Sequence, residues 1–438
     1  MRRLSAKSDV KVAVLGAGSF VFGPSVLKDA IAEHRLSGLE LALMDPNGPV
    51  VELMAAVGRR MGGDLGVKVS VTAHTERARA LEGADFVICS AARELKRRFE
   101  MDREIVERLS PGHLVTEFGG IAGISYSLRQ IALIQEICGD MRRMCPKAWL
   151  LEAANPLPRV SQAAHEEGVR TAGFCSVSLS AYGRIWHILH AQRIGYPFEP
   201  ARSVLEVTMA GLNHFSWVVD VRDAASGADL YPELRNMAPQ YAPAGEPATF
   251  RLFHETGYLP APGDDHIRDF IASRGEIPGR SWRRHGSVEE REARMELLRK
   301  VAEGQAPWQM LTEHESWEKP MDLVAAMAYD KPARFHALNL INCGQIEALG
   351  GGVFVETPAV GTSVGPLPER VELPASVAGA CELTATVTDT IVRAARRRSR
   401  RLVHRAVELD PTILDKGAGM AAIDACMGAH ADVLPAYE

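Results

Sequence analysis

The glycines of the segment GAGSFVFG carry the clearest chemical signature in the chain. Gly16 and Gly18 follow a run of β-branched and apolar residues, and a helical pattern begins after them. Backbone amides at the start of a helix bind phosphate, because they combine unsatisfied donors with the positive end of the helix dipole. The spacing departs from the strict GxGxxG pattern. The turn, including Ser19 and Phe20, is therefore a candidate site for a dinucleotide pyrophosphate, and a glycine turn without a ligand is the alternative.

Polar and small residues follow the next apolar runs. The second run ends at Asp45, whose carboxylate could accept hydrogen bonds from adenosine ribose hydroxyls, which favours NAD over NADP. Later runs end at Ser90 and Ala91 and at Asn155. Because ligands of open parallel sheets bind at the carboxyl ends of the strands, we expect these residues to line one crevice. Asn155 could hold the ribose or a substrate hydroxyl, or could be only a turn-forming Asn before Pro156.

Two kinds of hydrophobic pattern predict the elements that position these residues. Up to about residue 200 the apolar runs are continuous and alternate with helical patterns, which is typical of strands buried on both faces of a parallel sheet. We predict a Rossmann-like, doubly wound α/β domain over residues 1–200. The region 201–438 is predicted as an α+β substrate-binding and oligomerisation domain. In it we expect an antiparallel strand pair around GLNHFSW, long loops over about 228–290 and strands over 335–358.

Composition limits the partners. The chain has 46% hydrophobic residues and a net charge of −5, which describes a globular protein and gives no reason to expect nucleic acid. No stretch approaches the ~18 uncharged apolar residues of a membrane span, and we expect neither a membrane nor a secretory signal. Seven scattered cysteines form no CxxC pair, which favours the reducing cytoplasm. The arginine-rich run VRAARRRSRRLVHRA is interpreted as a solvated face of an amphipathic helix or a subunit contact, and a nucleic-acid patch is the alternative.

Further motifs give the chain a family resemblance over most of its length. In order they are GAGSFVFG, the strand end at Asp45, GADFVICSAA, TEFGGIAGISYSLR, ANPLP, the region of Cys175, GLNHFSW, GYLPAPGDDHIRDF and NCGQIEALGGGVFVETP. The chain resembles the NAD-dependent glycosidases of glycoside hydrolase family 4, and it could belong with their divergent relatives that act on sulfoquinovose glycosides. Lactate and malate dehydrogenases share only the first few of these features.

The resemblance implies a hydrolase in which NAD serves as a temporary electron sink, an exception to the usual pair of carboxylates. The 3-hydroxyl of the sugar is oxidised, a base removes the C2 proton and the leaving group is eliminated. Water then adds and the ketone is reduced again. A divalent metal, typically Mn²⁺ in this family, would polarise the 2- and 3-oxygens. Cys175 and His214 match its ligand positions; a buried strand cysteine and a packed or capping histidine are the alternatives.

The resemblance places the base in the loop motif GYLPAPGDDHIRDF. Asp265 is the nearest match, with His266 beside it, although a solvated pair of loop carboxylates would show the same pattern. Tyr258 is expected to be a wall or substrate contact. The residue after the metal-binding cysteine, commonly His, Asp or Asn in the family, is Ser176 here. The sequence therefore leaves the acid that protonates the leaving group unidentified.

Substrates with an anionic group are expected from the resemblance: sulfoquinovosides first, then uronides or 6-phosphoglycosides. Arg suits such anions, because its planar fork presents several fixed donors. The candidate substrate-binding residues are Asn155, Asn213, Arg129, Arg280, Trp282, Arg283 and Arg284. An exposed basic turn is the alternative for the last four. Glu117 could contact substrate or serve indirectly, or could be only a carboxylate near a helix start.

Two other functions stay open at this point. One is an NAD-dependent sugar or hydroxy-acid dehydrogenase, which would release NADH in proportion to turnover. The other is a non-catalytic NAD-binding sensor, which would bind the cofactor and hydrolyse nothing. The resemblance of the long C-terminal helical region to family subunit contacts also implies a homodimer or homotetramer, and the expected partner is a small-molecule glycoside.

Overall fold

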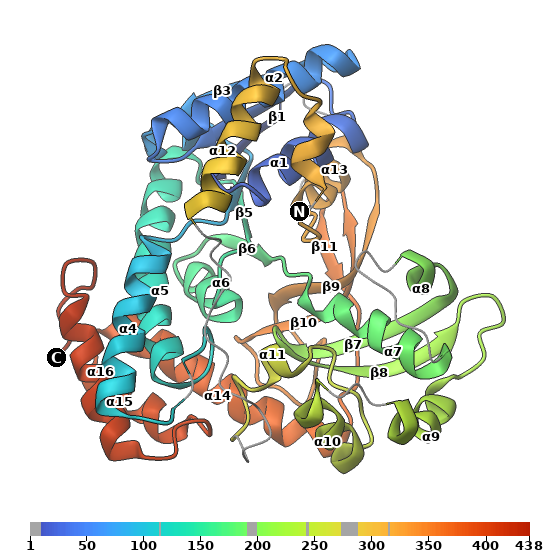
Figure 1. Ribbon diagram of the computed structural model, residues 1–438, viewed down its shortest axis with the longest axis vertical. Coiled ribbons are helices and arrows are strands. Elements are labelled where there is room, and N and C mark those ends of the chain that lie inside the picture. The colour runs from blue at the N-terminus through green and yellow to red at the C-terminus, as the bar shows by residue number, and fades with distance from the viewer. Residues whose placement is uncertain (1–9, 114, 191–198, 242–244, 273–287, 314–315) are drawn as a thin grey trace.

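The computed structural model describes residues 10–113, 115–190, 199–241, 245–272, 288–313 and 316–438 (Figure 1). One mixed sheet of eleven strands runs through these residues, in the order β3-β2-β1-β4-β5-β6-β9-β10-β7-β8, with β11 beside β10. The strands are β1 (Val10–Leu15), β2 (Leu39–Met44), β3 (Val69–His74), β4 (Phe86–Cys89), β5 (Trp149–Glu152), β6 (Arg170–Gly173), β7 (Leu205–Leu212), β8 (Phe215–Asp223), β9 (Ala333–Ile341), β10 (Phe354–Thr362) and β11 (Gly365–Pro368).

The first six strands form the predicted doubly wound half. Each neighbouring pair among them is parallel, and β1 and β4 are almost completely buried because helices cover both faces. These helices are α1 (Phe22–Leu27) with the π-helical turn η1 (Lys28–Glu33), α2 (Gly48–Leu65), α3 (Arg77–Leu81), α4 (Leu95–Leu109), α5 (Gly120–Met144) and α6 (Leu157–Glu166). The Rossmann-like fold expected from the continuous apolar runs is confirmed.

An antiparallel half continues the same sheet. Gly173 of β6 pairs with Asn339 of β9, and β9, β10, β7 and β8 follow as antiparallel neighbours. The predicted strand pair around GLNHFSW is the β7–β8 hairpin. Between β6 and this hairpin lie η2 (Val177–Leu179), α7 (Ser180–His190) and α8 (Glu199–Val204). The sheet thus brings the carboxyl end of β6 beside the hairpin turn.

The expectation of long loops over 228–290 is wrong for much of the described part. The segment contains α9 (Tyr231–Tyr241), α10 (Pro247–Thr256) and α11 (Asp264–Ile267). Pro247 lies at the start of α10, where the missing N–H costs no hydrogen bond, and Gly257 ends that helix in a left-handed conformation. Proline and glycine mark the ends of this helix and do not prevent it.

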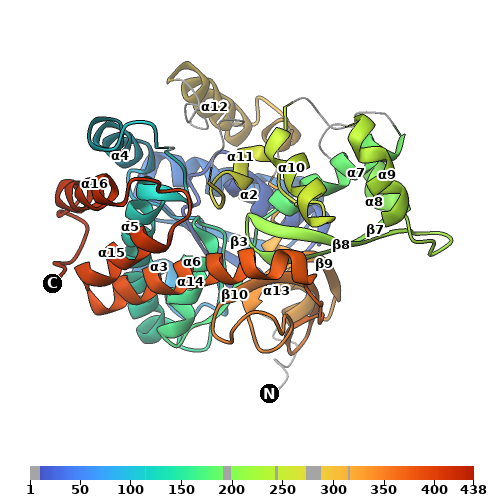
Figure 2. The same ribbon diagram turned by 90° about the horizontal axis from the view of Figure 1, so that it is seen from below.

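Helices make up most of the remaining chain. They are α12 (Val288–Ala302), η3 (Trp308–Thr312), α13 (Pro320–Tyr329), α14 (Ala375–Arg397), α15 (Arg400–Leu409) and α16 (Lys416–Ala429). Figure 2 shows the last three beside α5 and α4, and all three contact this part of the molecule. Within the described ranges, none of the helices combines the length and the apolar character needed to cross a membrane.

The arginine-rich run forms two helices and not the single amphipathic helix expected from its pattern. Arg398 has a φ of 49°, which ends α14, and Ser399 caps the start of α15. The apolar residues of the run, Val392, Ala395, Val403 and Ala406, are nevertheless buried. Several arginines pair with acidic neighbours, such as Arg396 with Glu166. The interpretation of the run as a solvated helix face therefore fits the described contacts.

Candidate active site

The glycine turn lies between β1 and α1, against the end of β2. The N–H of Gly18 donates to Asp45 Oδ2 at 3.0 Å, and the N–H of Asn47 donates to Asp45 Oδ1 at 2.9 Å. A Cβ atom on Gly18 would lie only 2.5 Å from Asp45 Oδ2, so the close approach of the carboxylate requires glycine. Ser19 Oγ accepts a bond from the N–H of Phe22, the first residue of α1. Asp45 thus lies where predicted and supports the turn; its bond to a ribose stays a prediction.

The turn and the neighbouring strand end form a cradle suited to a dinucleotide. Gly16 has a φ of 84°, and a Cβ atom there would come within 3.1 Å of the Ser90 backbone. The cavity beside Ser19 and Phe20 has a volume of about 830 Å³ and is also lined by Arg291 and Arg294 of α12. Narrow backbone spacing, free space and cationic side chains fit a diphosphate at this place.

Asn155 and Glu117 come together at the carboxyl end of β5. Asn155 Nδ2 donates to Glu117 Oε2 at 3.1 Å, although the two residues are 38 positions apart. The loop that holds Glu117 is anchored on the segment around α11, because the Phe118 N–H donates to Asp269 Oδ2 at 3.1 Å. A Cβ atom on Gly119 would overlap the Asp269 carbonyl. Gly119 is therefore required because two chain segments pack closely against each other here.

The two predicted metal ligands lie side by side. Cys175 follows β6, His214 lies in the turn between β7 and β8, and Cys175 Sγ is 3.4 Å from His214 Nε2. This separation suits two ligands of one ion with bonds of about 2.0–2.3 Å. Burial raises the pKa of the Cys175 thiol to about 12, and the charges of Glu356 and Glu318 add to this effect. A cation bound here would therefore have to replace the thiol proton.

The donor set is small. Among the residues that the structure describes, no group of three or more His, Cys, Asp or Glu side chains could hold a metal ion. One sulfur and one imidazole nitrogen would leave most positions around an ion to oxygen atoms of the substrate or water. Imidazole and oxygen suit Mn²⁺, whereas the thiolate is an unusual ligand for it. The pair fits a divalent cation that is completed by the substrate.

His266 lies beside this pair. Its ring is 4.6 Å from the ring of His214, in an edge-to-face arrangement, and the Phe118 ring is 4.3 Å from His214 on another side. Asp265 is exposed. By contrast, Asp264 Oδ1 accepts bonds from the Thr249 N–H at 2.7 Å and its hydroxyl at 2.6 Å, at the start of α10. Asp264 is therefore engaged in holding α10, and the two adjacent carboxylates have different roles.

The structure places two other predicted residues in contacts of a different kind. Arg129 forms an ion pair with the buried Asp102 at 2.7 Å, and Asp102 also bonds to His430. Tyr258 packs beside Tyr231, with Arg235 over its ring at 5.0 Å. Their substrate contacts stay predictions. Arg280, Trp282, Arg283 and Arg284 lie outside the described residues.

A cavity of about 290 Å³ adjoins Cys175 and contains a carboxyl that the sequence patterns did not indicate. Ser176 Oγ donates to Glu318 Oε1 at 3.1 Å. Burial raises the pKa of Glu318 above its ordinary value. Arg202 and Arg334 also line the cavity. Glu318 was missed because it follows Ser176 by 142 positions and belongs to none of the motifs.

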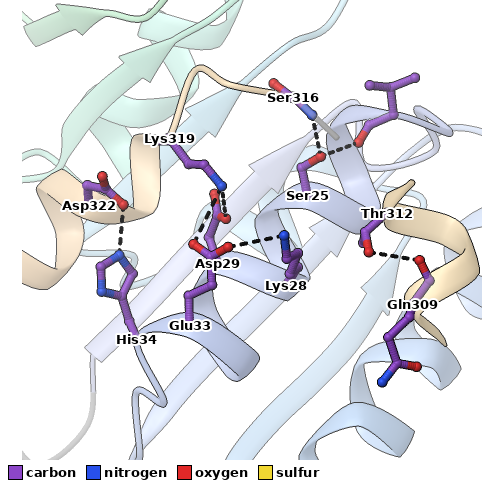
Figure 3. A network of polar contacts seen from close by, with 11 residues as sticks. Ser25, Lys28, Asp29, Glu33, His34, Gln309, Thr312, Ser316, Lys319 and Asp322 are labelled. Carbon is purple, nitrogen blue, oxygen red and sulfur yellow. Dashed lines mark hydrogen bonds and ion pairs between the residues drawn. The ribbon is translucent and has the colours of Figure 1, made fainter. Parts of the chain in front are cut away.

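Polar contacts fix the segment that carries Glu318, as Figure 3 shows. The Ser316 N–H donates to Ser25 Oγ at 2.7 Å, and Lys319 Nζ lies 2.7 Å from Asp29 Oδ1. Asp322 contacts His34 at 2.7 Å. Burial raises the pKa of Asp29 to about 8, although Lys319 opposes this shift. The helix that follows the glycine turn is thereby connected to the cavity beside Cys175.

Comparisons with known proteins agree with this arrangement. Residues 11–190 match the profile of family 4 glycosyl hydrolases, and residues 209–413 match the C-terminal domain of that family. An alpha-galactosidase of Bacillus subtilis (strain 168) is 26% identical over 447 residues, which cover 98% of this chain and 100% of the relative. An alpha-galacturonidase of the same organism is 24% identical, covering 85% of this chain and 88% of the relative.

A solved structure has the same fold. A 6-phospho-alpha-glucosidase from gut microorganisms, determined in complex with NAD and Mn²⁺, superposes with a TM-score of 0.78 at 19% identity, over 98% of this chain and 100% of that one. The cofactors in that complex are the two that the resemblance implies here. With both halves of the chain matched, the conclusion on family is direct: the chain belongs to family 4 of the glycosyl hydrolases.

Proposed function

We propose that this glycosyl hydrolase cleaves the glycoside of an anionic sugar through transient oxidation at C3 and elimination across C1 and C2. The observation that carries the proposal is the pair of Cys175 Sγ and His214 Nε2 at 3.4 Å, with the His266 ring at 4.6 Å from that of His214. The residue next to the candidate base Asp265 thus lies beside the candidate cation site, an arrangement that suits removal of a proton beside a carbonyl. The glycine turn on the same sheet is a candidate NAD site, which supports the oxidation and reduction steps.

The bound groups and the protein have separate tasks. NAD supplies hydride transfer, and a divalent cation supplies polarisation of the sugar oxygens. The turn around Gly16 and Gly18 would hold the diphosphate, next to the cavity lined by Arg291 and Arg294. Cys175 and His214 would hold the cation. Asn155, fixed by Glu117 at 3.1 Å, offers its remaining amide atoms to the ribose or to a sugar hydroxyl.

Two proton transfers are assigned to side chains. Asp265, with His266 beside it, would remove the proton from C2 of the oxidised sugar. The Ser176 hydroxyl, which donates to Glu318 at 3.1 Å, would pass a proton to the oxygen of the leaving group. A hydroxyl between a carboxyl and the substrate can pass a proton in both directions. Glu318 would then do what the family's ionisable residue after the cysteine does.

Two observations support the proposal that the substrate is anionic. Arg202 and Arg334 line the cavity beside Cys175, and guanidinium groups bind carboxylates, phosphates and sulfonates with several donors. The relatives include an alpha-galacturonidase and a 6-phospho-alpha-glucosidase, whose names specify anionic sugars. Sulfoquinovosides, uronides and 6-phosphoglycosides are the candidates. We also propose a homodimer or homotetramer in the cytoplasm, where the free cysteines would stay reduced.

The experiment compares 4-nitrophenyl glycosides of these sugars, in both anomers, with enzyme that has been stripped of NAD and then resupplied. We expect hydrolysis of at least one anionic glycoside only after NAD is added, with no net formation of NADH. Accumulation of NADH in proportion to turnover would instead identify a dehydrogenase. Binding of NAD with no hydrolysis of any glycoside would indicate a sensor. Full hydrolysis without NAD would contradict the proposal.

A further inference from the structure

The motif NCGQIEALGGGVFVETP ends in VETP, which contains the buried carboxylate of Glu356. None of the steps proposed above uses this carboxylate. Glu356 lies in β10, in the middle of the antiparallel half, opposite Gly211 of β7 and Asn339 of β9. Its exposed fraction is 0%. A buried carboxylate is costly unless it is hydrogen-bonded, so its partners indicate its role.

Four side chains donate to Glu356. Oε2 accepts from Asn213 Nδ2 and Asn339 Nδ2, each at 3.0 Å. Oε1 accepts from Ser216 Oγ at 2.9 Å and from Ser178 Oγ. An amide NH₂ group can only donate, so Oε2 must remain an acceptor. Four donors around two oxygens stabilise a negative charge at this position.

These donors flank the two predicted metal ligands. Ser178 follows Cys175 by three positions, whereas Asn213 and Ser216 lie on either side of His214. One carboxylate therefore connects the loop after β6 with the β7–β8 turn, and the Cys175–His214 distance depends on it.

The charge of Glu356 acts on the same place. A buried carboxylate linked to both ligand segments creates a negative potential there, which favours a cation. With a thiolate and a neutral imidazole as ligands, a divalent cation keeps one positive charge, and the carboxylate of Glu356 compensates it without direct contact.

We propose that Glu356 is the positioning and charge-balancing residue of a divalent-cation site at Cys175 and His214. It acts through the side chains of Asn213 and Ser178. This inference rests on the cation site of the proposed function but not on the glycosidic substrate. It assigns a role to a residue 142 positions or more from both ligands.

The test is Mn²⁺ binding to the full-length chain, followed by the electron paramagnetic resonance signal of free Mn²⁺. In Glu356→Gln, the carboxamide oxygen can face the amides of Asn213 and Asn339, while its NH₂ group donates to the serine hydroxyls, which also accept. The fold should therefore persist with one charge removed. We expect the Kd for Mn²⁺ to rise roughly 10- to 100-fold, with an unchanged Kd for NAD.

Glu152→Gln is the control, because Glu152 is also fully buried but its side chain accepts from the backbone amides of Ala153 and Ala154 in the described hydrogen bonds and not from Asn213, Ser178 or Ser216. Its Kd for Mn²⁺ should equal that of the wild type. Should Glu356→Gln fail to fold, the double variant Ser178→Ala/Ser216→Ala keeps the charge and removes two links, and we expect a rise of about threefold or more.

The outcomes separate the two proposals. A folded variant of either kind with a Kd within twofold of the wild type would overturn the role of Glu356. A wild-type chain that binds no Mn²⁺ would overturn both this role and the cation site. A wild-type chain that binds Mn²⁺ tightly but hydrolyses none of the glycosides would leave the role of Glu356 intact and refute the proposed function.

Discussion

The glycine turn and the Cys175–His214 centre occupy the same sheet but are built in different ways. The turn is made from one continuous stretch, and its key contact joins Gly18 to Asp45 only 27 positions later. The centre takes side chains from the end of β6, the β7–β8 turn, α11 and β10. The turn depends on backbone conformation, whereas the centre depends on buried side-chain contacts between distant segments. Changes to each region should therefore have separable effects.

Removal of a ligand should have the largest effect and should be confined to the centre. We expect Cys175→Ala to weaken Mn²⁺ binding by more than about a hundredfold and to lower kcat/KM by ~10³-fold, because the cation would lose a negatively charged ligand. Titration with Mn²⁺ and NAD would measure this. Cys343→Ala, at an exposed cysteine, is the control. A matching loss of NAD affinity would show that the two regions are not separable.

The reciprocal change should be confined to the turn. In Gly18→Ala, the new Cβ would lie 2.5 Å from Asp45 Oδ2 and would push the carboxylate or the turn out of place. We expect the Kd for NAD to rise about tenfold, which is the scale of a typical overpacking cost, with unchanged Mn²⁺ binding. Gly63→Ala, where a Cβ meets nothing within 4 Å, should leave both constants unchanged. Equal NAD binding in Gly18→Ala would contradict the assigned cofactor site.

Substrates with different leaving groups test whether Glu318 supplies the proton to the leaving group. We expect Glu318→Gln to lower kcat/KM for an alkyl glycoside by ~10²-fold and that for a nitrophenyl glycoside by only about threefold, since a good leaving group needs little protonation. Asp322→Asn, which lines the same cavity but contacts His34, is the control. Equal losses on both substrates would assign Glu318 to structure alone.

The smallest expected change concerns the pH dependence of stability, which the buried carboxyl of Glu152 should affect. Glu152 accepts bonds from two backbone amides, and burial raises its pKa to about 8 from the ordinary value of 4.5. Between these values the folded chain binds more protons than the unfolded chain, so the free energy of unfolding should fall as pH rises.

Thermal unfolding of the wild type and Glu152→Gln from pH 5 to pH 8.5 would measure this. The variant should be the more stable of the two at pH 8 and should lack that part of the pH dependence. Parallel curves for the two proteins would show that Glu152 does not titrate in this window.

The sequence predicted those elements of the fold that local hydrophobic patterns determine. Continuous apolar runs predicted the parallel strands, and GLNHFSW predicted a hairpin, because burial on one or both faces sets these patterns. The helices α9 and α10 were not predicted, because the prolines and glycines of this segment were interpreted as signs of loops. Glu318 was not predicted, since its contact with Ser176 arises only in the folded chain. The partners of Arg129 could not be foreseen for the same reason.

The most direct test of the account is the fate of the C2 hydrogen during hydrolysis in D₂O. Elimination requires that this hydrogen leave as a proton and that a solvent deuteron take its place. We expect the released sugar to carry deuterium at C2, detected by NMR, and a primary isotope effect with substrate deuterated at C2. A product that retains its original C2 hydrogen in full would contradict the mechanism.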